Sequence, residues 1–174
     1  DLQAQTLSYT HPEKLQFVAG GVERSDSVLA GLNIIRDRAH DDDWVLVHDV
    51  ARPCVRLDDI QKLIETLSED EVGGVLANQV RDTIKQSIEH SFRVSSSLTR
   101  NQLWQALTPQ MFRFGVLYQA LNRAKKYKVS VTDESAAIEA LGYQPLLVLG
   151  AYDNIKITYP EDLALADYLL RQQV

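Results

Sequence analysis

Short apolar runs alternate with amphipathic stretches along this chain. Runs of strand length cover residues 15–19, 44–48 and 73–77, and two more, 146–149 and 154–157, follow near the end. A continuous apolar run of this length is typical of a strand that is buried on both faces of a parallel sheet. Because such runs alternate with stretches of helical length, we expect an α/β fold with a mostly parallel sheet flanked by helices.

The intervening stretches carry apolar residues three and four positions apart. This spacing predicts helices over residues 25–39, 58–67, 113–126 and 132–141, and a last helix that begins around Pro160. Ser25 or Asp26 is expected to cap the first helix, and Thr132 the fourth, which Gly142 should end. Both tryptophans, Trp44 and Trp104, are expected in the core.

Residues from about 80 to 100 break this pattern. Apolar residues alternate with polar ones on either side of a polar, turn-like segment, Glu89–Ser91. The alternation predicts an antiparallel hairpin that protrudes from the α/β domain as an arm. An isolated hairpin is marginally stable in water, so we expect the arm to have a partner surface. No internal repeat and no linker interrupts the chain, which predicts a single domain over residues 1–174.

Composition excludes several classes of protein. The 174 residues include 18 Lys and Arg against 24 Asp and Glu, and a net charge of −6 does not attract a nucleic-acid backbone. The one cysteine, Cys54, excludes an intrachain disulfide and a cysteine-built zinc site. No apolar run approaches the roughly 18 residues of a membrane helix. Residues 1–5 lack the features of a signal peptide, and we expect a cytoplasmic protein without a membrane partner.

Polar residues gather directly after the predicted strands. In open α/β sheets, ligands bind beyond the carboxyl ends of the strands. An aspartate there can hold Mg²⁺ against substrate phosphates, and Arg and Lys can neutralise phosphate oxygens. The residues so placed are Gly20, Gly21, Arg24, Asp49, Arg52, Arg81, Asp82, Thr83, Asp153, Asn154 and Lys156. They predict phosphoryl or nucleotidyl chemistry on a small anionic substrate.

Each of these residues also has a structural interpretation. Asp49 precedes a turn and is equally suited to capping it, and Arg52 is equally suited to pairing with an acid. The pair Gly20–Gly21 serves many strand-to-helix turns for backbone reasons alone. His48 fits a packed histidine better than a general base, and Cys54 fits a small buried residue. Spacing and composition therefore predict an α/β enzyme with a phosphate-bearing ligand and go no further.

Six motifs, taken together and in order, extend this interpretation. They are residues 20–28, His48–Cys54, Val80–Thr83, Leu103–Gln110, Thr132–Glu134 and 153–163. In combination they resemble the 2-C-methyl-D-erythritol 4-phosphate cytidylyltransferases of the non-mevalonate isoprenoid pathway. The resemblance extends from about Phe17 to the C-terminus. The wording Ala-Arg-Pro-Cys and Leu-Trp-Gln-Ala-Leu-Thr-Pro-Gln favours this family over the ribitol or ribulose 5-phosphate cytidylyltransferases, which share the fold and stay as the alternative.

The resemblance implies a Rossmann-like nucleotidyltransferase fold with a protruding β-arm. It also implies that a phosphate oxygen of methylerythritol phosphate attacks the α-phosphorus of CTP and expels pyrophosphate, with Mg²⁺ organising the triphosphate. Asp49 would lie by the ribose, the substrate or the metal, with Asp153 as a second metal candidate. Residues matching the nucleotide-binding positions and their neighbours are Gly20, Gly21, Val22, Arg24, Ser27 and Val50.

The family also implies roles for the remaining candidates. Around methylerythritol phosphate it would place Asp49, Arg52, Thr108, Thr132 and Lys156. Thr83 and Arg100, on the arm, would reach the active site of a second subunit in an interlocked homodimer. In-line transfer requires mostly positioning and charge neutralisation, which Arg100 and Lys156 would supply as the catalytic residues.

Two features depart from the family pattern. Val22 occupies a position where relatives often carry a different, sometimes acidic, residue. The family begins with a glycine-rich loop bearing basic residues and then a Pro-Lys-Gln segment, and nothing in Asp1–His11 matches either one. We therefore expect the chain to lack this segment and, by itself, to be inactive. A non-catalytic subunit that keeps the fold and the dimer arm is the alternative from another functional class.

Overall fold

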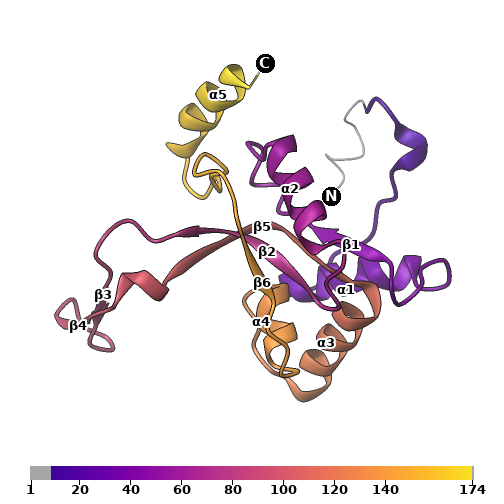
Figure 1. The fold of residues 1–174 in the computed structure, drawn as a ribbon, viewed down its shortest axis with the longest axis horizontal. Coiled ribbons are helices and arrows are strands. Elements are labelled where there is room, and N and C mark those ends of the chain that lie inside the picture. Colours follow the sequence, from indigo (N-terminus) through magenta and orange to yellow (C-terminus); the bar gives the residue numbers. More distant parts are fainter. Residues whose placement is uncertain (1–8, 174) are drawn as a thin grey trace. The chain divides into compact units, whose positions relative to one another are not determined.

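The computed structural model describes residues 9–173 and has an α/β fold (Figure 1). Residues 1–8, which bear on the expected absence of a signal peptide, lie outside the described residues. The chain divides into two compact units. Unit 1 comprises Asp1–Val45 and Arg113–Gln144, and unit 2 comprises Leu46–Phe112 and Pro145–Val174. The single-domain boundary of residues 1–174 stays a prediction.

Unit 1 is built from helices. A short 3-10 turn, η2 (Pro12–Lys14), precedes α1 (Arg24–Ile35), α3 (Phe114–Tyr127) and α4 (Glu134–Glu139). α1 packs on α3, and α3 packs on α4. The buried positions recur at helical spacing, which confirms the predicted apolar faces; they include Leu29, Leu32, Leu117, Ala120, Leu121, Ala137 and Ile138.

The helix caps differ from the expected ones. α1 begins after Glu23, and Asp26 lies three residues further on, where its carboxylate accepts from the Glu23 N–H in a capping box. α4 is capped by Asp133, whose Oδ1 accepts from the Ala136 N–H at 2.9 Å, so the prediction that Thr132 caps it was wrong. Gly142 follows α4 with a φ of +93°, as the expected stop requires.

A four-stranded mixed sheet runs in the order β1–β5–β2–β6. Its strands are β1 (Trp44–Val47), β2 (Gly73–Gln79), β5 (Trp104–Arg113) and β6 (Leu146–Leu149). β2 pairs parallel to β6 and antiparallel to β5. β1, β2 and β6 match predicted runs, whereas β5 was not predicted.

Two helices and a hairpin complete unit 2. α2 (Leu57–Leu67) packs against β2 and β6 through buried leucines, and α5 (Asp162–Gln172) ends the described chain. The predicted hairpin is confirmed: β3 (Lys85–Ser87) pairs antiparallel with β4 (Val94–Ser97). A 3-10 turn, η3 (Arg100–Gln102), leads from the hairpin back to β5. The hairpin projects from the strands of unit 2 as the expected arm (Figure 1).

Three expectations about individual segments were wrong. Residues 15–19 are not a strand and have no strand partner within the described part, and Phe17 is exposed. Residues 154–157 are irregular, because Asn154 turns its side chain into the protein and the Ile157 N–H donates to the Ala51 carbonyl instead of a strand. Trp104 is exposed and Trp44 is only half-buried, so neither tryptophan lies in the core. Across residues 9–173, no helix combines the length and the apolar character needed to cross a membrane.

Candidate active site

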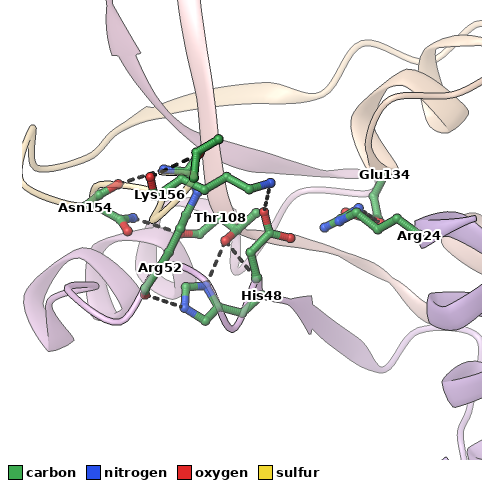
Figure 2. A network of polar contacts seen from close by, with 9 residues as sticks. Arg24, His48, Arg52, Thr108, Glu134, Asn154 and Lys156 are labelled. Atoms are coloured by element: carbon green, nitrogen blue, oxygen red, sulfur yellow. Dashed lines mark hydrogen bonds and ion pairs between the residues drawn. The ribbon is translucent and has the colours of Figure 1, made fainter. Parts of the chain in front are cut away.

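Asp49 directly follows β1 and is fixed at both its backbone and its side chain. Its N–H donates to Thr108 Oγ1 on β5 at 3.0 Å. Its Oδ2 accepts from Lys156 Nζ at 2.9 Å (Figure 2). The Asp49 carboxylate is mostly buried and the Lys156 side chain is about half exposed, at 14% and 47%. The fixed Asp49 carboxylate therefore holds the Lys156 ammonium group in a position that is accessible to solvent.

His48 links the same threonine to the loop that carries Arg52. Its Nε2 lies 3.1 Å from the Arg52 carbonyl, and its Nδ1 lies 2.9 Å from Thr108 Oγ1. A carbonyl can only accept, so the Nε2 atom carries the proton in this contact. In the neutral imidazole Nδ1 then accepts from the Thr108 hydroxyl, and this tautomer is assigned from the partners. His48 therefore holds two neighbours in place through its hydrogen bonds, but the residue is exposed rather than packed.

Asn154 is the buried anchor of this cluster. Its Nδ2 donates to the Thr108 carbonyl at 2.8 Å, and its own carbonyl accepts from Arg52 Nη1 at 2.7 Å (Figure 2). Burial lowers the pKa of the Arg52 guanidinium, against the charge of Asp49, which raises it. Arg52 Nε and Asn154 Oδ1 are buried without a hydrogen-bond partner among the described residues. Buried polar atoms normally have partners, so these two are candidates for water or ligand contacts.

Of the two candidate metal ligands, Asp49 and Asp153, only Asp49 remains suitable. Both carboxylate oxygens of Asp153 accept from the Arg56 guanidinium, and this contact raises the pKa of Arg56. Asp153 therefore does not fit a metal ligand. Asp49 fits as a single carboxylate, since Mg²⁺ is commonly held by one or two carboxylates together with substrate phosphates. Within residues 9–173, no cluster of three or more His, Cys, Asp or Glu side chains could hold a metal.

In unit 1, the predicted nucleotide-binding loop runs from Gly20 to Ser27 and enters α1. The Gly21 N–H donates to Ser27 Oγ at 3.0 Å. A Cβ on Gly21 would lie 2.1 Å from the Asp26 Cβ, so the fold of the loop requires glycine there. Val22 is almost fully exposed at the tip of this loop. The loop therefore offers backbone groups at a tight turn before a helix N-terminus.

Arg24, at the start of α1, contacts α4 and keeps 35% of its side chain exposed. Its Nη1 lies 2.6 Å from Oε1 of Glu134, a carboxylate that is fully buried (Figure 2). Thr132 is exposed and lines a cavity of about 610 Å³, together with Arg24 and Lys125. The structure thus brings a predicted nucleotide-binding loop and a predicted substrate-binding residue to one cavity of unit 1.

The arm candidates lie at the base of the hairpin in unit 2. Arg100 Nη1 donates to the Arg81 carbonyl at 2.6 Å, and the Arg81 guanidinium lies 3.3 Å from the centre of the Tyr152 ring. Thr83 is exposed near the start of the arm. Val50, a predicted nucleotide-binding residue outside the arm, is almost fully exposed in the loop after β1. Hydrogen bonds join Asp49, Lys156, Thr108, His48, Asn154 and Arg52 into one group, called here the Asp49 cluster. The structure does not bring Thr83 or Arg100 to this cluster, and the roles of both residues stay predictions.

Sequence reasoning found the members of the Asp49 cluster but not the contacts between them. Unit 2 brings together four of the five predicted substrate residues, Asp49, Arg52, Thr108 and Lys156, whereas Thr132 belongs to unit 1; the functional roles of all five stay predictions. Glu134 and Arg56 were missed as partners. Their contacts join residues 110 and 97 positions apart, and a single sequence carries no signal for such pairings.

Comparisons with known proteins give the family context. The profile of the 2-C-methyl-D-erythritol 4-phosphate cytidylyltransferase (IspD) family matches residues 1–172. The curated enzyme of that name from Aliivibrio fischeri (strain ATCC 700601 / ES114) is 46% identical over 166 residues, which are 95% of this chain and 69% of the relative. The one from Ruthia magnifica is 48% identical over 171 residues, 98% of this chain and 71% of the relative.

Solved structures agree with the sequence relatives. The crystal structure of the Francisella tularensis enzyme has a TM-score of 0.86 and 38% identity, and the match covers 95% of this chain and 76% of that one. A second, the enzyme from Thermus thermophilus, has a TM-score of 0.76 and 30% identity, with 89% and 72% covered. The α/β nucleotidyltransferase-like fold is confirmed. On the family match and these relatives, the chain belongs to the 2-C-methyl-D-erythritol 4-phosphate cytidylyltransferase family.

Proposed function

We propose that the protein transfers a cytidylyl group from CTP to 2-C-methyl-D-erythritol 4-phosphate, in isoprenoid precursor synthesis. The observation that carries the proposal, beyond family membership, is the cluster in which Asp49, Arg52 and Lys156 are fixed around Thr108 and Asn154. It provides two cations and one carboxylate on anchored backbone, which suits a phosphate-bearing substrate.

The reaction forms one P–O bond and breaks another. A phosphate oxygen of methylerythritol phosphate attacks the α-phosphorus of CTP, and pyrophosphate leaves with the electron pair of the bond that breaks. In-line phosphoryl transfer depends on positioning and charge neutralisation more than on covalent chemistry by the protein. Lys156 and Arg52 would neutralise the phosphate of the methylerythritol substrate. In unit 1, Thr132 is the residue that the family resemblance assigns to substrate binding. The Gly20–Ser27 loop would hold the nucleoside through its backbone groups.

Asp49 is the one residue that this proposal assigns to Mg²⁺ binding. Mg²⁺ would be bound by the phosphates of CTP with Asp49 as a protein ligand, and when bound it neutralises developing charge on the triphosphate. Lys156 holds Asp49 Oδ2 in the structure, so metal and ammonium would share one carboxylate. Asp153 is not included, because Arg56 occupies both of its oxygens. A cytoplasmic location stays a prediction from the sequence.

A homodimer that forms through the arm is part of the same proposal. Apolar side chains of the hairpin lie in solvent, most clearly Phe92 at its turn, with Ile88, Val94 and Leu98. A two-stranded hairpin with exposed apolar residues gains stability from a second surface. Thr83 and Arg100 would then serve the active site of the partner subunit. Sedimentation equilibrium should give a dimer that Phe92→Ser weakens, and a monomer at all concentrations would reject this part.

One assay tests the central proposal. The protein, with the glycine-rich basic segment of the family included, is mixed with CTP, Mg²⁺ and either methylerythritol phosphate or ribitol 5-phosphate, and pyrophosphate release is followed with mass detection of the CDP-linked product. We expect turnover with methylerythritol phosphate and little with ribitol 5-phosphate. Preference for ribitol 5-phosphate would favour the related cytidylyltransferases. A folded protein that turns over neither substrate would favour the non-catalytic subunit.

A further inference from the structure

In unit 1, Arg24 and Glu134 form a contact that has no direct part in the proposed reaction. Glu134 is fully buried at the first turn of α4, and its Oε1 accepts from Arg24 Nη1 at 2.6 Å. Its other oxygen, Oε2, is buried and has no hydrogen-bond partner among the described residues. The two residues are 110 positions apart in the chain.

As a source of stability this arrangement is poor. Burying a carboxylate costs several kcal/mol, and one ion pair repays the cost only when the remaining lone pairs are also satisfied. Here one oxygen is left without a donor in the described part. A well-packed apolar pair of similar volume would be at least as stable. The contact is therefore better explained by the geometry that it imposes than by the energy that it adds.

The geometry joins two segments that the proposed function assigns to different substrates. Arg24 begins α1 directly after the Gly20–Glu23 turn, and that turn is closed onto the helix by the bond from the Gly21 N–H to Ser27 Oγ. Glu134 begins α4 two residues after Thr132. Any movement of the loop relative to Thr132 must therefore stretch or break the contact between Arg24 and Glu134.

A second tether of the same loop is weaker. Asp26 Oδ1 lies 2.8 Å from Lys125 Nζ near the end of α3, and this contact lowers the pKa of the Asp26 carboxylate. The Lys125 side chain is 63% exposed, so water and salt screen the pair. The rigid link between the loop and α4 must come from the buried Glu134.

We propose that Arg24 and Glu134 form a positioning pair that couples the nucleotide-binding loop to the substrate-binding Thr132, so that binding of CTP orders residues 128–134. The inference rests on the proposed function, because the two segments gain their roles from it. It reassigns Arg24 from contacting the nucleotide to positioning the loop that does so. Coupling between two sites requires an element that both of them bias, and the ion pair is that element in unit 1.

Hydrogen–deuterium exchange tests the coupling without turnover. CTP with Mg²⁺ should slow exchange in residues 20–27 and also in 128–134 of the parent protein. In Glu134→Gln, which keeps size and one oxygen but removes the charge, protection should persist in 20–27 and disappear from 128–134. Glu139→Gln is the matched control: it is the same change on the same helix, at an exposed residue that accepts from Ser135, and it should behave as the parent.

Steady-state kinetics give a second readout. Glu134→Gln should raise the KM for both CTP and methylerythritol phosphate by at least about five-fold, the low end of typical coupling between sites. Arg24→Lys keeps a cation beside the buried carboxylate and should retain part of the coupling, even if Glu134→Gln proves unstable in thermal unfolding. A purely structural role would lower the unfolding temperature and leave both KM values unchanged.

The outcomes separate the inference from the function beneath it. If CTP protects neither segment in the parent protein, the nucleotide-binding assignment fails. If CTP protects both segments in the parent and equally in Glu134→Gln, with unchanged KM values, the positioning role is refuted and the proposed function stands.

Discussion

Replacing Lys156 with alanine should abolish most turnover while leaving the fold nearly intact. Lys156 Nζ lies 2.9 Å from Asp49 Oδ2, with almost half of the lysine side chain in solvent. At that separation in water, Coulomb's law gives about 1.4 kcal/mol, before the cost of ordering a long side chain is subtracted. Exposed pairs measured in double-mutant cycles contribute about 0–1 kcal/mol. The unfolding temperature should therefore fall by at most about 2–4 °C.

The effect on catalysis should be far larger. Loss of one donor that stabilises charge in a transition state lowers kcat by about 10²–10³, or about 2.7–4 kcal/mol. In the proposed reaction the substrate at this site carries a phosphate group, so the removed ammonium would be replaced only by water. The ratio of the two effects distinguishes a catalytic lysine from a surface ion pair.

Lys62 provides a matched control. Its side chain is 50% exposed and its Nζ lies 3.3 Å from Asp59, a nearly buried carboxylate, much as Lys156 lies beside Asp49. Lys62 Nζ also donates to the Leu149 carbonyl at 2.8 Å, so Lys62→Ala gives an upper limit for the stability cost of leaving an aspartate without its lysine. Both variants are assayed for pyrophosphate release at saturating CTP and methylerythritol phosphate, and for thermal unfolding. We expect similar unfolding temperatures and a loss of turnover in Lys156→Ala alone.

Two results would refute the reasoning. If Lys156→Ala turns over within a few-fold of the parent, the lysine does not neutralise charge in the transition state and the assignment of the Asp49 cluster as the substrate site fails. If Lys156→Ala unfolds far below Lys62→Ala, the ion pair holds the fold and its loss of activity has a structural cause.

Three further predictions follow from single contacts. Cys54→Ser should retain substantial turnover, because burial raises the pKa of the Cys54 thiol and no nucleophile is needed; complete loss in a folded variant would contradict this. His48→Gln keeps a donor for the Arg52 carbonyl but loses the acceptor for the Thr108 hydroxyl, and His48→Asn keeps the acceptor but loses the donor. Both variants should raise the KM for methylerythritol phosphate. Unchanged KM values would show that His48 is not part of the site. Asp162 Oδ2 accepts from the backbone N–H groups of Tyr159 and Thr158, which lowers the pKa of its carboxyl. Its stabilisation is therefore present above the unfolded pKa of about 3.9 and is lost as pH falls through the lower folded value. Chemical denaturation of Asp162→Asn from pH 7 to 2 should therefore converge with the parent at the acid end, and a constant difference would contradict the assignment.

The helices could be predicted because their apolar positions repeat with helical spacing. α3 begins and ends within one residue of the predicted 113–126, and Leu117 and Ala120 face inward as expected. The hairpin was predicted for the same kind of reason, since alternation and a polar turn are local signals. Caps were less certain, because Thr132 and Asp133 are both good capping residues and only the backbone decides between them.

β5 could not be predicted because its sequence argues against a strand. Trp104–Arg113 contains Pro109, which has no N–H to donate to a ladder. The pairing of β2 with β5 shifts register between Val75 and Ala77, opposite the part of β5 that contains the proline. A bulge of this kind accommodates a proline inside a sheet, and it arises from tertiary pairing that a local pattern does not record.

The charged residues of the Asp49 cluster could be located from the sequence, but the contacts that position them could not. The charged groups lie on strand ends and loops, where composition reveals them, and Lys156 and Arg52 remain partly exposed to meet a ligand. Their positions are set by neutral groups: the Thr108 hydroxyl and carbonyl, the Asn154 amide and backbone, and the imidazole of His48.

The two cations of the cluster are held differently, and this difference affects substrate binding. Before substrate arrives, Asp49 holds the Lys156 ammonium in place and partly neutralises it. Because the pair is partly exposed, exchanging the carboxylate for a substrate phosphate costs little in desolvation. Arg52 differs, since its guanidinium is partly buried and its Nη1 is held by a backbone carbonyl that carries no net charge. The charge of Asp49 acts on this guanidinium too, but Arg52 Nε is buried without a hydrogen-bond partner among the described residues and is available to the incoming phosphate. Arg52→Lys, which loses the planar fork, should therefore weaken substrate binding.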